Sequence, residues 1–254
     1  MITSKLVSSN SHHMSNNSEY RIFPLGDAAL TIDFGNVINA SLNKKVLSLF
    51  SLLRKNPLPG MVEVVPAYSS LTVYYDLVAL RKKISTEPVA YDYMKRQLEK
   101  TISTIDEEID SPPSRLLKIP VCYDLVFASG IKELAMTKHL TIDEIICIHT
   151  SQTYRVYMLG FLPGFAYMGE VDERISMPRK TQPENVAAGS VGIAGKQTGI
   201  YPLASPGGWC IIGRTPLKLF DETGEGKTLF IAGDTVQFIS ISKDEFEGYQ
   251  SRHT

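Results

Sequence analysis

The side chains best suited to chemistry lie between Tyr154 and Asp221, and eleven of the chain's 18 glycines fall between Gly160 and Gly224. Lys196 stands inside the run Gly195-Lys196-Gln197-Thr198-Gly199. A lysine flanked by glycines can meet an anion that neighbouring backbone N–H groups also reach. The same residues equally suit an exposed hairpin charge followed by ordinary turn chemistry. The run therefore indicates an anion contact or a tight turn.

His149 is the second candidate. Ile142, Ile145, Ile146 and His149 recur at helical spacing, which places the imidazole on the buried stripe of its helix. An ordinary pKa near ~6.5 suits histidine to acid–base work. Position alone favours the simpler interpretation, a core histidine bonded to a carbonyl.

Arg179 and several aromatic residues accompany these candidates. A guanidinium suits bidentate carboxylate binding, although Arg179 beside Lys180 also fits a solvated basic pair. Trp209, the only tryptophan, follows Pro206-Gly207-Gly208 and suits either ligand stacking or core packing. The same two interpretations apply to the other candidate groove or partner-binding residues, which are Phe161, Pro163, Phe165 and Tyr167.

Several familiar motifs are absent from the sequence. A phosphate-binding loop would need glycine at Ser190 and a hydroxyl residue at Gln197. No zinc-type cluster and no Gly-x-Ser-x-Gly elbow occurs, so we expect no metal site in this chain. Cys122, Cys147 and Cys210 are isolated, which favours buried thiols in a reducing compartment, the cytoplasm. A nucleophilic cysteine is the weaker alternative.

Composition excludes two classes of partner. The 254 residues are 43% hydrophobic, with 26 basic and 27 acidic side chains and a net charge of −1. This balance gives no electrostatic basis for binding nucleic acid or an anionic membrane. No apolar run is long enough for a spanning helix. Residues 1–18 are Ser- and Asn-rich and are predicted to be a disordered tail.

The pattern of elements predicts two domains. In the first, residues 19–110, strands at 20–25, 28–34, 61–65 and 71–75 accompany a helix through Leu42–Leu53 and a long helix with Pro88 in its first turn. Asn39 or Ser41 is the predicted cap of the earlier helix. Ser111-Pro112-Pro113-Ser114 is the predicted linker, because two prolines continue neither helix nor central strand.

The second domain, residues 115–245, is predicted to begin with a strand at 116–121. Helices at 131–138 and 141–150 follow, the latter opening with the capping box Thr141-Ile142-Asp143-Glu144. Beyond Thr153 we expect only short strands and turns, at 154–159, 191–194, 209–213, 217–220, 229–231 and 236–241. Many short strands with Gly and Pro between them favour a closed barrel or a sandwich.

These runs resemble one known family. Phe23-Pro24-Leu25-Gly26-Asp27 and Glu63-Val64-Val65-Pro66 match its N-terminal domain. Tyr154–Phe165, Pro178-Arg179 and Gly189–Pro202 match its C-terminal domain. The chain is similar, from Tyr20 onward, to the family named for the B subunit of 5-oxoprolinase, which is also called the KipI family or allophanate hydrolase subunit 1.

The resemblance implies an α+β fold, in which a small N-terminal α+β domain precedes a cyclophilin-like β-barrel. It also implies two partners, a related C subunit (allophanate hydrolase subunit 2) and an A subunit. Together these would form an ATP-dependent 5-oxoprolinase that opens 5-oxoproline to L-glutamate. Two other roles within the family stay open, an inhibitor of a histidine kinase and a carboxyltransferase acting on urea or another amide.

Under the enzyme interpretation each candidate has a role. His149 and Lys196 are the expected catalytic residues. Arg179, Gln197, Thr198 and Tyr201 are the expected substrate-binding residues. ATP is expected on another subunit or at a shared interface. One segment departs from the family pattern: Pro183–Gly189 is one residue short, with Glu184 where arginine is usual.

Overall fold

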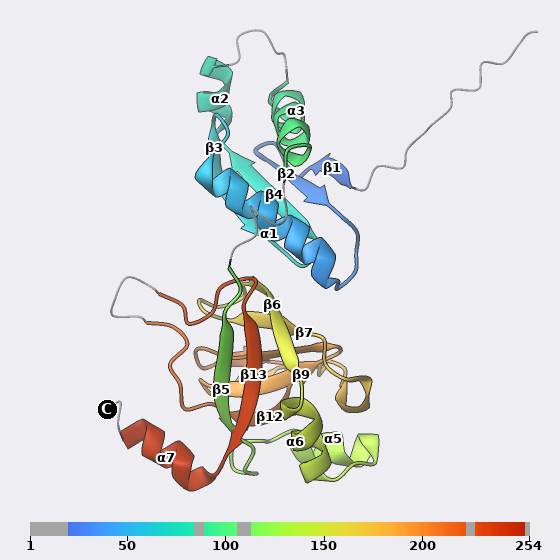
Figure 1. The fold of residues 1–254 in the computed structure, drawn as a ribbon, viewed down its shortest axis with the longest axis vertical. Coiled ribbons are helices and arrows are strands. Elements are labelled where there is room, and N and C mark those ends of the chain that lie inside the picture. The colour runs from blue at the N-terminus through green and yellow to red at the C-terminus, as the bar shows by residue number, and fades with distance from the viewer. Residues whose placement is uncertain (1–19, 84–88, 106–112, 222–226, 252–254) are drawn as a thin grey trace, which may run out of the picture.

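The computed structural model describes residues 20–83, 89–105, 113–221 and 227–251 (Figure 1). Three predictions fall wholly or partly outside these residues: the tail at 1–18, Pro88, and the Ser111-Pro112 half of the linker. The predicted domain limits also stay a prediction, because the boundary would fall within residues 106–112. The α+β architecture itself, a small sheet followed by a barrel, is confirmed.

The N-terminal part is a four-stranded antiparallel sheet covered by helices. Its strands follow the order β1-β2-β4-β3, with β1 at Arg21–Pro24, β2 at Ala29–Asp33, β3 at Met61–Pro66 and β4 at Ser70–Tyr75. The helices are α1 at Ala40–Lys55, α2 at Leu77–Lys83 and α3 at Ala90–Ile102.

The amphipathic pattern of α1 explains its position. Val46, Leu49 and Leu53 are completely buried against the sheet. The helix begins where the Asn39 side chain accepts a hydrogen bond from the Leu42 backbone N–H at 3.0 Å, which confirms Asn39 as the cap. Apolar spacing thus fixes which face of α1 meets the sheet and leaves other side chains of the helix free to face the barrel.

Seven strands of the described chain close into a barrel, in the order β10-β7-β6-β13-β5-β12-β9. Their bounds are β5 Leu116–Cys122, β6 Thr153–Leu159, β7 Ala166–Gly169, β9 Ser190–Ala194, β10 Gln197–Ile200, β12 Cys210–Arg214 and β13 Thr235–Ile241. β13 and β5 run parallel, and the other pairs are antiparallel. Inward-facing apolar side chains such as Val236 and Phe238 fill the interior.

Helices α5 (Ile131–Lys138) and α6 (Ile142–Thr150) lie at one end of the barrel, and α1 lies over the opposite end (Figure 1). The predicted capping box of α6 is confirmed, because Thr141 and Glu144 exchange hydrogen bonds with each other's backbone N–H groups. A short sheet of β8 (Glu184–Val186) and β11 (Ser205–Gly207) lies outside the barrel strand order.

Two expectations for the second half are wrong. The chain after Thr153 is not only strands and turns, because the short helix η1 (Glu173–Ile175) and the terminal helix α7 (Lys243–Ser251) occur there. Residues 217–220 and 229–231 are not strands either. Leu219 and Phe230 are buried, but in these runs the backbone makes only the isolated bridge Phe220–Thr228.

Candidate functional site

Five of the residues singled out in the sequence gather around one hollow of about 470 Å³ on the outer wall of the barrel. They are Tyr167, Arg179, Lys196, Gln197 and Trp209. Ala194, Gly195 and Ile38 complete the lining. We call this the barrel hollow. Because Ile38 comes from the segment before α1, the hollow lies at the junction of the two parts of the chain.

The β9–β10 hairpin forms one wall. Gly195 occupies its turn at φ +59°, a conformation that glycine adopts without steric cost. The turn is held from outside: the Gly195 N–H donates to the Met177 carbonyl at 2.5 Å, and the Ser176 hydroxyl donates to the Gly195 carbonyl at 2.8 Å. The hairpin tip is therefore fixed in place by hydrogen bonds to residues 176–177.

Strand alternation decides which β10 side chains reach the hollow. Thr198 and Ile200 are completely buried in the barrel interior, so Gln197 and Gly199 face outward. Lys196, at the tip, pairs with Glu173 at 2.8 Å, with both side chains at least half exposed. Hydrogen bonding to Glu173 and its charge raise the pKa of Lys196. An exposed pair of this kind contributes little stability and is easily exchanged for another anion.

Arg179 contributes the unpaired positive charge of the hollow. Within the described part of the chain, no carboxylate lies within ion-pair distance of its guanidinium, which packs along Gly208. A Cβ at Gly208 would lie 3.1 Å from Arg179 Nε. Glycine at this position therefore leaves the space that the guanidinium occupies. Burial raises the pKa of both Tyr167 and Tyr201, and the Arg179 charge works in the opposite direction.

Aromatic rings form the remaining wall and extend beneath it. We call Phe161, Phe165, Tyr167, Tyr201 and Trp209 the aromatic cluster. Phe165 lies at its centre, with ring centroids 4.8 Å from Tyr167, 5.2 Å from Tyr201 and 5.4 Å from Trp209. Phe161 is the outermost ring, 61% exposed at φ +71°.

His149 and Thr198 lie elsewhere, inside the barrel. The Thr198 hydroxyl donates to the Gly192 carbonyl at 3.0 Å, so it accepts from His149 Nε2 at 3.2 Å. Nε2 therefore carries the hydrogen, and Nδ1 accepts from the Tyr123 hydroxyl at 2.7 Å. Burial lowers the pKa of His149 to about 3, which keeps the ring neutral at physiological pH. We call these bonded residues the His149 network.

The structure thus divides the predicted site residues into three groups. Arg179, Lys196, Gln197, Tyr167 and Trp209 line the barrel hollow. Phe165 and Tyr201 are buried in the aromatic cluster. Phe161 and Pro163 lie on the adjoining loop, and both are exposed. His149 and Thr198 are enclosed, with no exposed surface. An acid–base role for His149 stays a prediction, and it requires that a proton reach the interior through the Thr198 or Tyr123 hydroxyl.

Two residues of this region, Ile38 and Glu173, were not predicted from the sequence. Ile38 lines the hollow but lies in a loop before α1, where no periodicity indicates a position. Glu173 pairs with Lys196, but nothing in the sequence around it indicates that partner. Glu184, where the family usually has arginine, pairs with Lys180 at 2.9 Å, so the unusual acid has a local cation of its own.

Among the described residues, no group of three or more His, Cys, Asp or Glu side chains is placed to hold a metal ion. No helix in the described segments combines the length and apolar character needed to cross a membrane. Burial raises the pKa of Cys210 to about 11, which disfavours a thiolate there, whereas Cys147 is exposed.

Comparison with known proteins supplies the family. A family model described as the carboxyltransferase domain, subdomain C and D, matches residues 20–230. The B subunit of 5-oxoprolinase from Bacillus subtilis (strain 168) is 42% identical over 235 residues, which make up 91% of this chain and 97% of that protein. The sequence match therefore extends over nearly the whole of both chains.

Two solved structures share the fold. That of a protein called TTHA0988 superimposes with a TM-score of 0.71 at 33% identity, over 84% of this chain and 40% of that one. The Kluyveromyces lactis urea carboxylase gives a TM-score of 0.70 at 18% identity, over 90% of this chain and 22% of that one. The second likeness shows the fold alone. The chain therefore belongs to the carboxyltransferase domain family, subdomain C and D, among the relatives of the 5-oxoprolinase B subunit.

Proposed function

We propose that this chain is the B subunit of an ATP-dependent 5-oxoprolinase and, with the A and C subunits, opens 5-oxoproline to L-glutamate. The nearly full-length similarity to a protein of that name supports the proposal. The observation that carries it is the barrel hollow, where Arg179, unpaired among the described side chains, stands beside an amide side chain and aromatic rings. Such a combination of few polar groups in an apolar hollow is typical of small-ligand sites.

Each group in the hollow matches a part of the substrate. The 5-oxoproline carboxylate suits the planar fork of Arg179, which can bind both oxygens at once. Its five-membered ring suits the faces of Tyr167 and Trp209. Its lactam, an amide with one donor and one acceptor, suits the Gln197 side chain. These contacts would hold the lactam in one orientation while the ring is opened.

Lys196 and the His149 network support that binding in different ways. Lys196 can leave its exposed partner Glu173 and meet the negative charge that develops on the lactam oxygen. His149 fixes Thr198, and through it the strand that presents Gln197 and Lys196. In this proposal Lys196 touches the reacting atoms, whereas His149 positions β10 from the barrel interior.

The hollow does not suit a nucleoside triphosphate. Its lining offers two cationic side chains, one of which is already paired, and the sequence has no phosphate-binding loop. We therefore place ATP binding on another subunit or at a shared interface and derive no step through ATP here. The exposed Phe161 next to the hollow is the proposed contact for the C subunit.

The test is ATP-dependent glutamate release by the chain co-expressed with the A and C subunits, with parallel preparations that omit the C subunit. Arg179→Ala should raise KM for 5-oxoproline about 10- to 100-fold, the effect of losing a charge-assisted hydrogen bond, with kcat less affected. Arg81→Ala, an exposed arginine on α2, is the matched control. Unchanged KM in Arg179→Ala would remove the hollow as the substrate site.

A second function, carboxyl transfer to urea or another amide, is favoured by the family description and by the shared fold of the urea carboxylase. It would use the same Arg179 and Gln197 contacts but would need a biotin-carrying partner. Carboxylation of urea by the chain with such a partner, without any turnover of 5-oxoproline, would decide for this alternative.

A further inference from the structure

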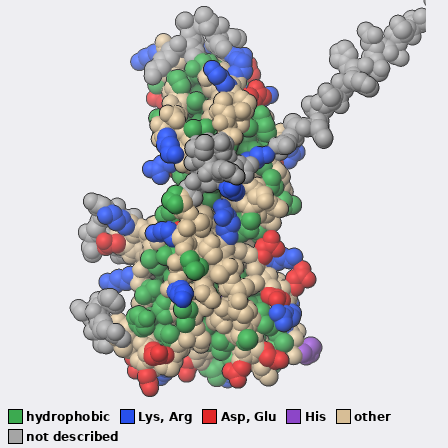
Figure 2. Space-filling view, in the orientation of Figure 1, with side chains coloured by type: hydrophobic (Ala, Val, Ile, Leu, Met, Phe, Trp, Pro, Cys, Tyr) green, Lys and Arg blue, Asp and Glu red, His purple; other side chains and the backbone are tan. Residues whose placement is uncertain are grey.

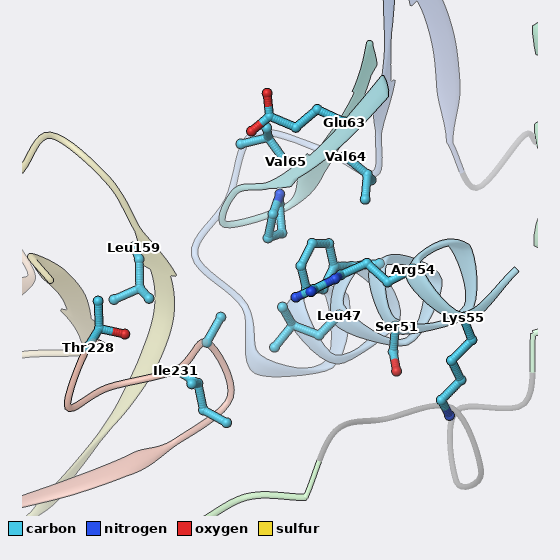
Figure 3. Close-up of a pocket in the computed structure, with 13 residues that line it drawn as sticks. Leu47, Ser51, Arg54, Lys55, Glu63, Val64, Val65, Leu159, Thr228 and Ile231 are labelled. Atoms are coloured by element: carbon cyan, nitrogen blue, oxygen red, sulfur yellow. The ribbon is translucent and has the colours of Figure 1, made fainter. Parts of the chain in front are cut away.

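A larger cleft, of about 760 Å³, opens between the N-terminal part and the barrel, away from the barrel hollow (Figure 3). One wall comes from the C-terminal half of α1 and from β3, with Leu47, Phe50 and Val64. The facing wall comes from the end of β6 and from residues 228–232, with Leu159 and Ile231. No residue lines both this cleft and the barrel hollow. We call it the α1 cleft.

The walls of the α1 cleft are mainly apolar, and part of that surface is open to solvent. Ile231 is 40% exposed and Val65 is 36% exposed, although both belong to the lining. Leu47 and Val64 behind them are buried. Apolar side chains left exposed in a concave place at a domain junction are typical of a binding site.

Three charged side chains also line this cleft, the cations of Arg54 and Lys55 and the carboxylate of Glu63. The Arg54 guanidinium lies over the Phe50 ring, 5.6 Å from its centroid, and extends toward the barrel wall (Figure 3). In the same view Lys55 points away from the gap, and the Glu63 carboxylate lies beside Val65 on the β3 wall. Among the described residues Arg54 has no carboxylate partner, and its contact with Phe50 holds it at the edge of the apolar surface.

We propose that the α1 cleft binds a small amphipathic anion, with an apolar body against Leu47, Phe50 and Ile231 and a carboxylate on Arg54. Arg54 and Lys55 outnumber Glu63 in the lining, and Arg54 lies over the apolar wall, so an anion is favoured over a cation or an uncharged ligand. The volume and apolar walls suit a longer aliphatic or aromatic acid better than a five-membered lactam acid. This site is therefore separate from the proposed substrate site and does not depend on it.

The test uses 1-anilinonaphthalene-8-sulfonate, an aromatic anion whose fluorescence rises in apolar surroundings, titrated into the full chain. Octanoate should displace the probe, and octan-1-ol, which has the same chain without the charge, should displace it much less. Arg54→Ala should raise the Kd of the probe about 10- to 100-fold, as expected for the loss of a charge-assisted hydrogen bond. Arg81→Ala is the control and should bind like the wild type.

Two further variants locate the site without relying on Arg54. Ile231→Asp places a negative charge on a partly exposed wall position and should abolish binding while leaving the far-ultraviolet circular dichroism unchanged. Phe161→Ala should leave probe binding unaltered, because Phe161 lies in the aromatic cluster. The proposal is overturned if Arg54→Ala binds as tightly as the wild type, if octan-1-ol competes as well as octanoate, or if Phe161→Ala removes the binding.

Discussion

At the scale of single residues, His149 is a fully enclosed polar group near the candidate site. Its ring stacks on Phe238 at a centroid distance of 4.4 Å, and both nitrogens are hydrogen-bonded. Burial favours the neutral ring and lowers its pKa from 6.5 to about 3. Between pH 6.5 and about pH 3 the imidazole is therefore protonated in the unfolded chain but stays neutral in the folded chain. Stability from this residue is complete above pH 6.5 and declines as pH falls toward 3.

His149→Phe should remove that pH dependence. The variant loses stability at pH 8, by about 1–3 kcal/mol, because the Tyr123 hydroxyl is left without its partner, whereas Thr198 still donates to the Gly192 carbonyl. The difference in free energy of unfolding between wild type and variant should shrink by about 1.4 kcal/mol per pH unit below pH 6.5. Urea unfolding at pH 8.0 and 5.5 measures it. A difference that stays constant would mean that the folded imidazole titrates normally.

Gly199 shows how one missing side chain shapes the aromatic cluster. A Cβ at this position would lie 2.8 Å from the Ala166 carbonyl oxygen, 3.1 Å from Trp209 and 3.2 Å from Phe165. Gly199→Ala should therefore lower the free energy of unfolding by about 1–3 kcal/mol, the usual cost of overpacking. It should also change the fluorescence of Trp209, the only tryptophan. Gly160→Ala is the control, because its nearest neighbour is the flexible end of Met158 at 3.4 Å. Equal effects of the two substitutions would contradict the packing argument.

At the scale of elements, α1 is joined to β6 through Asn43. Its side-chain amide donates to the Tyr157 carbonyl at 3.0 Å, and its Oδ1 accepts from Arg155 Nε at 2.9 Å. Asn43 is fully buried, and burial also lowers the pKa of Arg155. These bonds connect the helix that contributes to the α1 cleft directly to the barrel wall.

A double-mutant cycle of Asn43→Ala and Arg155→Ala should give a coupling energy of about 0.5–3 kcal/mol, as direct partners do. Asn39→Ala removes the cap of the same helix, at about 1 kcal/mol, but should be additive with Arg155→Ala. Urea unfolding of the three single and two double variants measures both cycles. Additivity in the Asn43 cycle would show that the two parts of the chain are held together by other contacts.

The sequence predicts elements well where the local pattern and the tertiary environment agree. Helices α1 and α6 follow their apolar spacing and caps, and β5 and β13 follow their apolar runs. β10 escaped prediction because Gln197-Thr198-Gly199-Ile200 has no apolar alternation. It is a strand because β7 and β9 pair with it on both sides. Conversely, the runs around Leu219 and Phe230 are apolar because they are buried, without forming strands.

The candidate site was predictable in composition but not in arrangement. Glycine, charge and aromatic character singled out Arg179, Lys196 and Trp209, which do line one hollow. Nothing in the sequence could show that His149 and Thr198 bond to each other inside the barrel, because 49 positions separate them. The contribution of Ile38 depends on how the two parts of the chain pack, which no local pattern encodes.

At the scale of the whole molecule, two hollows lie at the junction, and an exposed apolar loop stands beside one of them. Arg54 lines the α1 cleft and Arg179 lines the barrel hollow. Phe161 is exposed on the loop between β6 and β7. In Figure 2 hydrophobic side chains are scattered among charged ones over both parts of the molecule, with no single-sign charged face in that view. Exposed apolar side chains such as Phe161 are therefore the anchors that we propose for a partner.

Phe161 is the anchor that we expect to matter most. A non-glycine residue at positive φ costs of order 1–3 kcal/mol, and here the ring gains only edge contacts with Phe165 and Tyr201. Phe161→Gly removes both the strain and the ring, so the isolated chain should be as stable as the wild type or more stable. The same variant should bind about 30-fold or more weakly to the C subunit, as expected for the loss of an aromatic hot spot.

Thermal unfolding of the free chain and calorimetric titration with the C subunit separate these two effects. Met136→Ala is the matched control, since Met136 is 71% exposed on α5, far along the barrel from the loop. It should change neither quantity appreciably. A fall in the thermal stability of Phe161→Gly would instead assign the ring a structural role. It would mean that packing of the ring stabilises the free chain by more than the backbone strain costs. Retained affinity would place the partner surface elsewhere on the molecule.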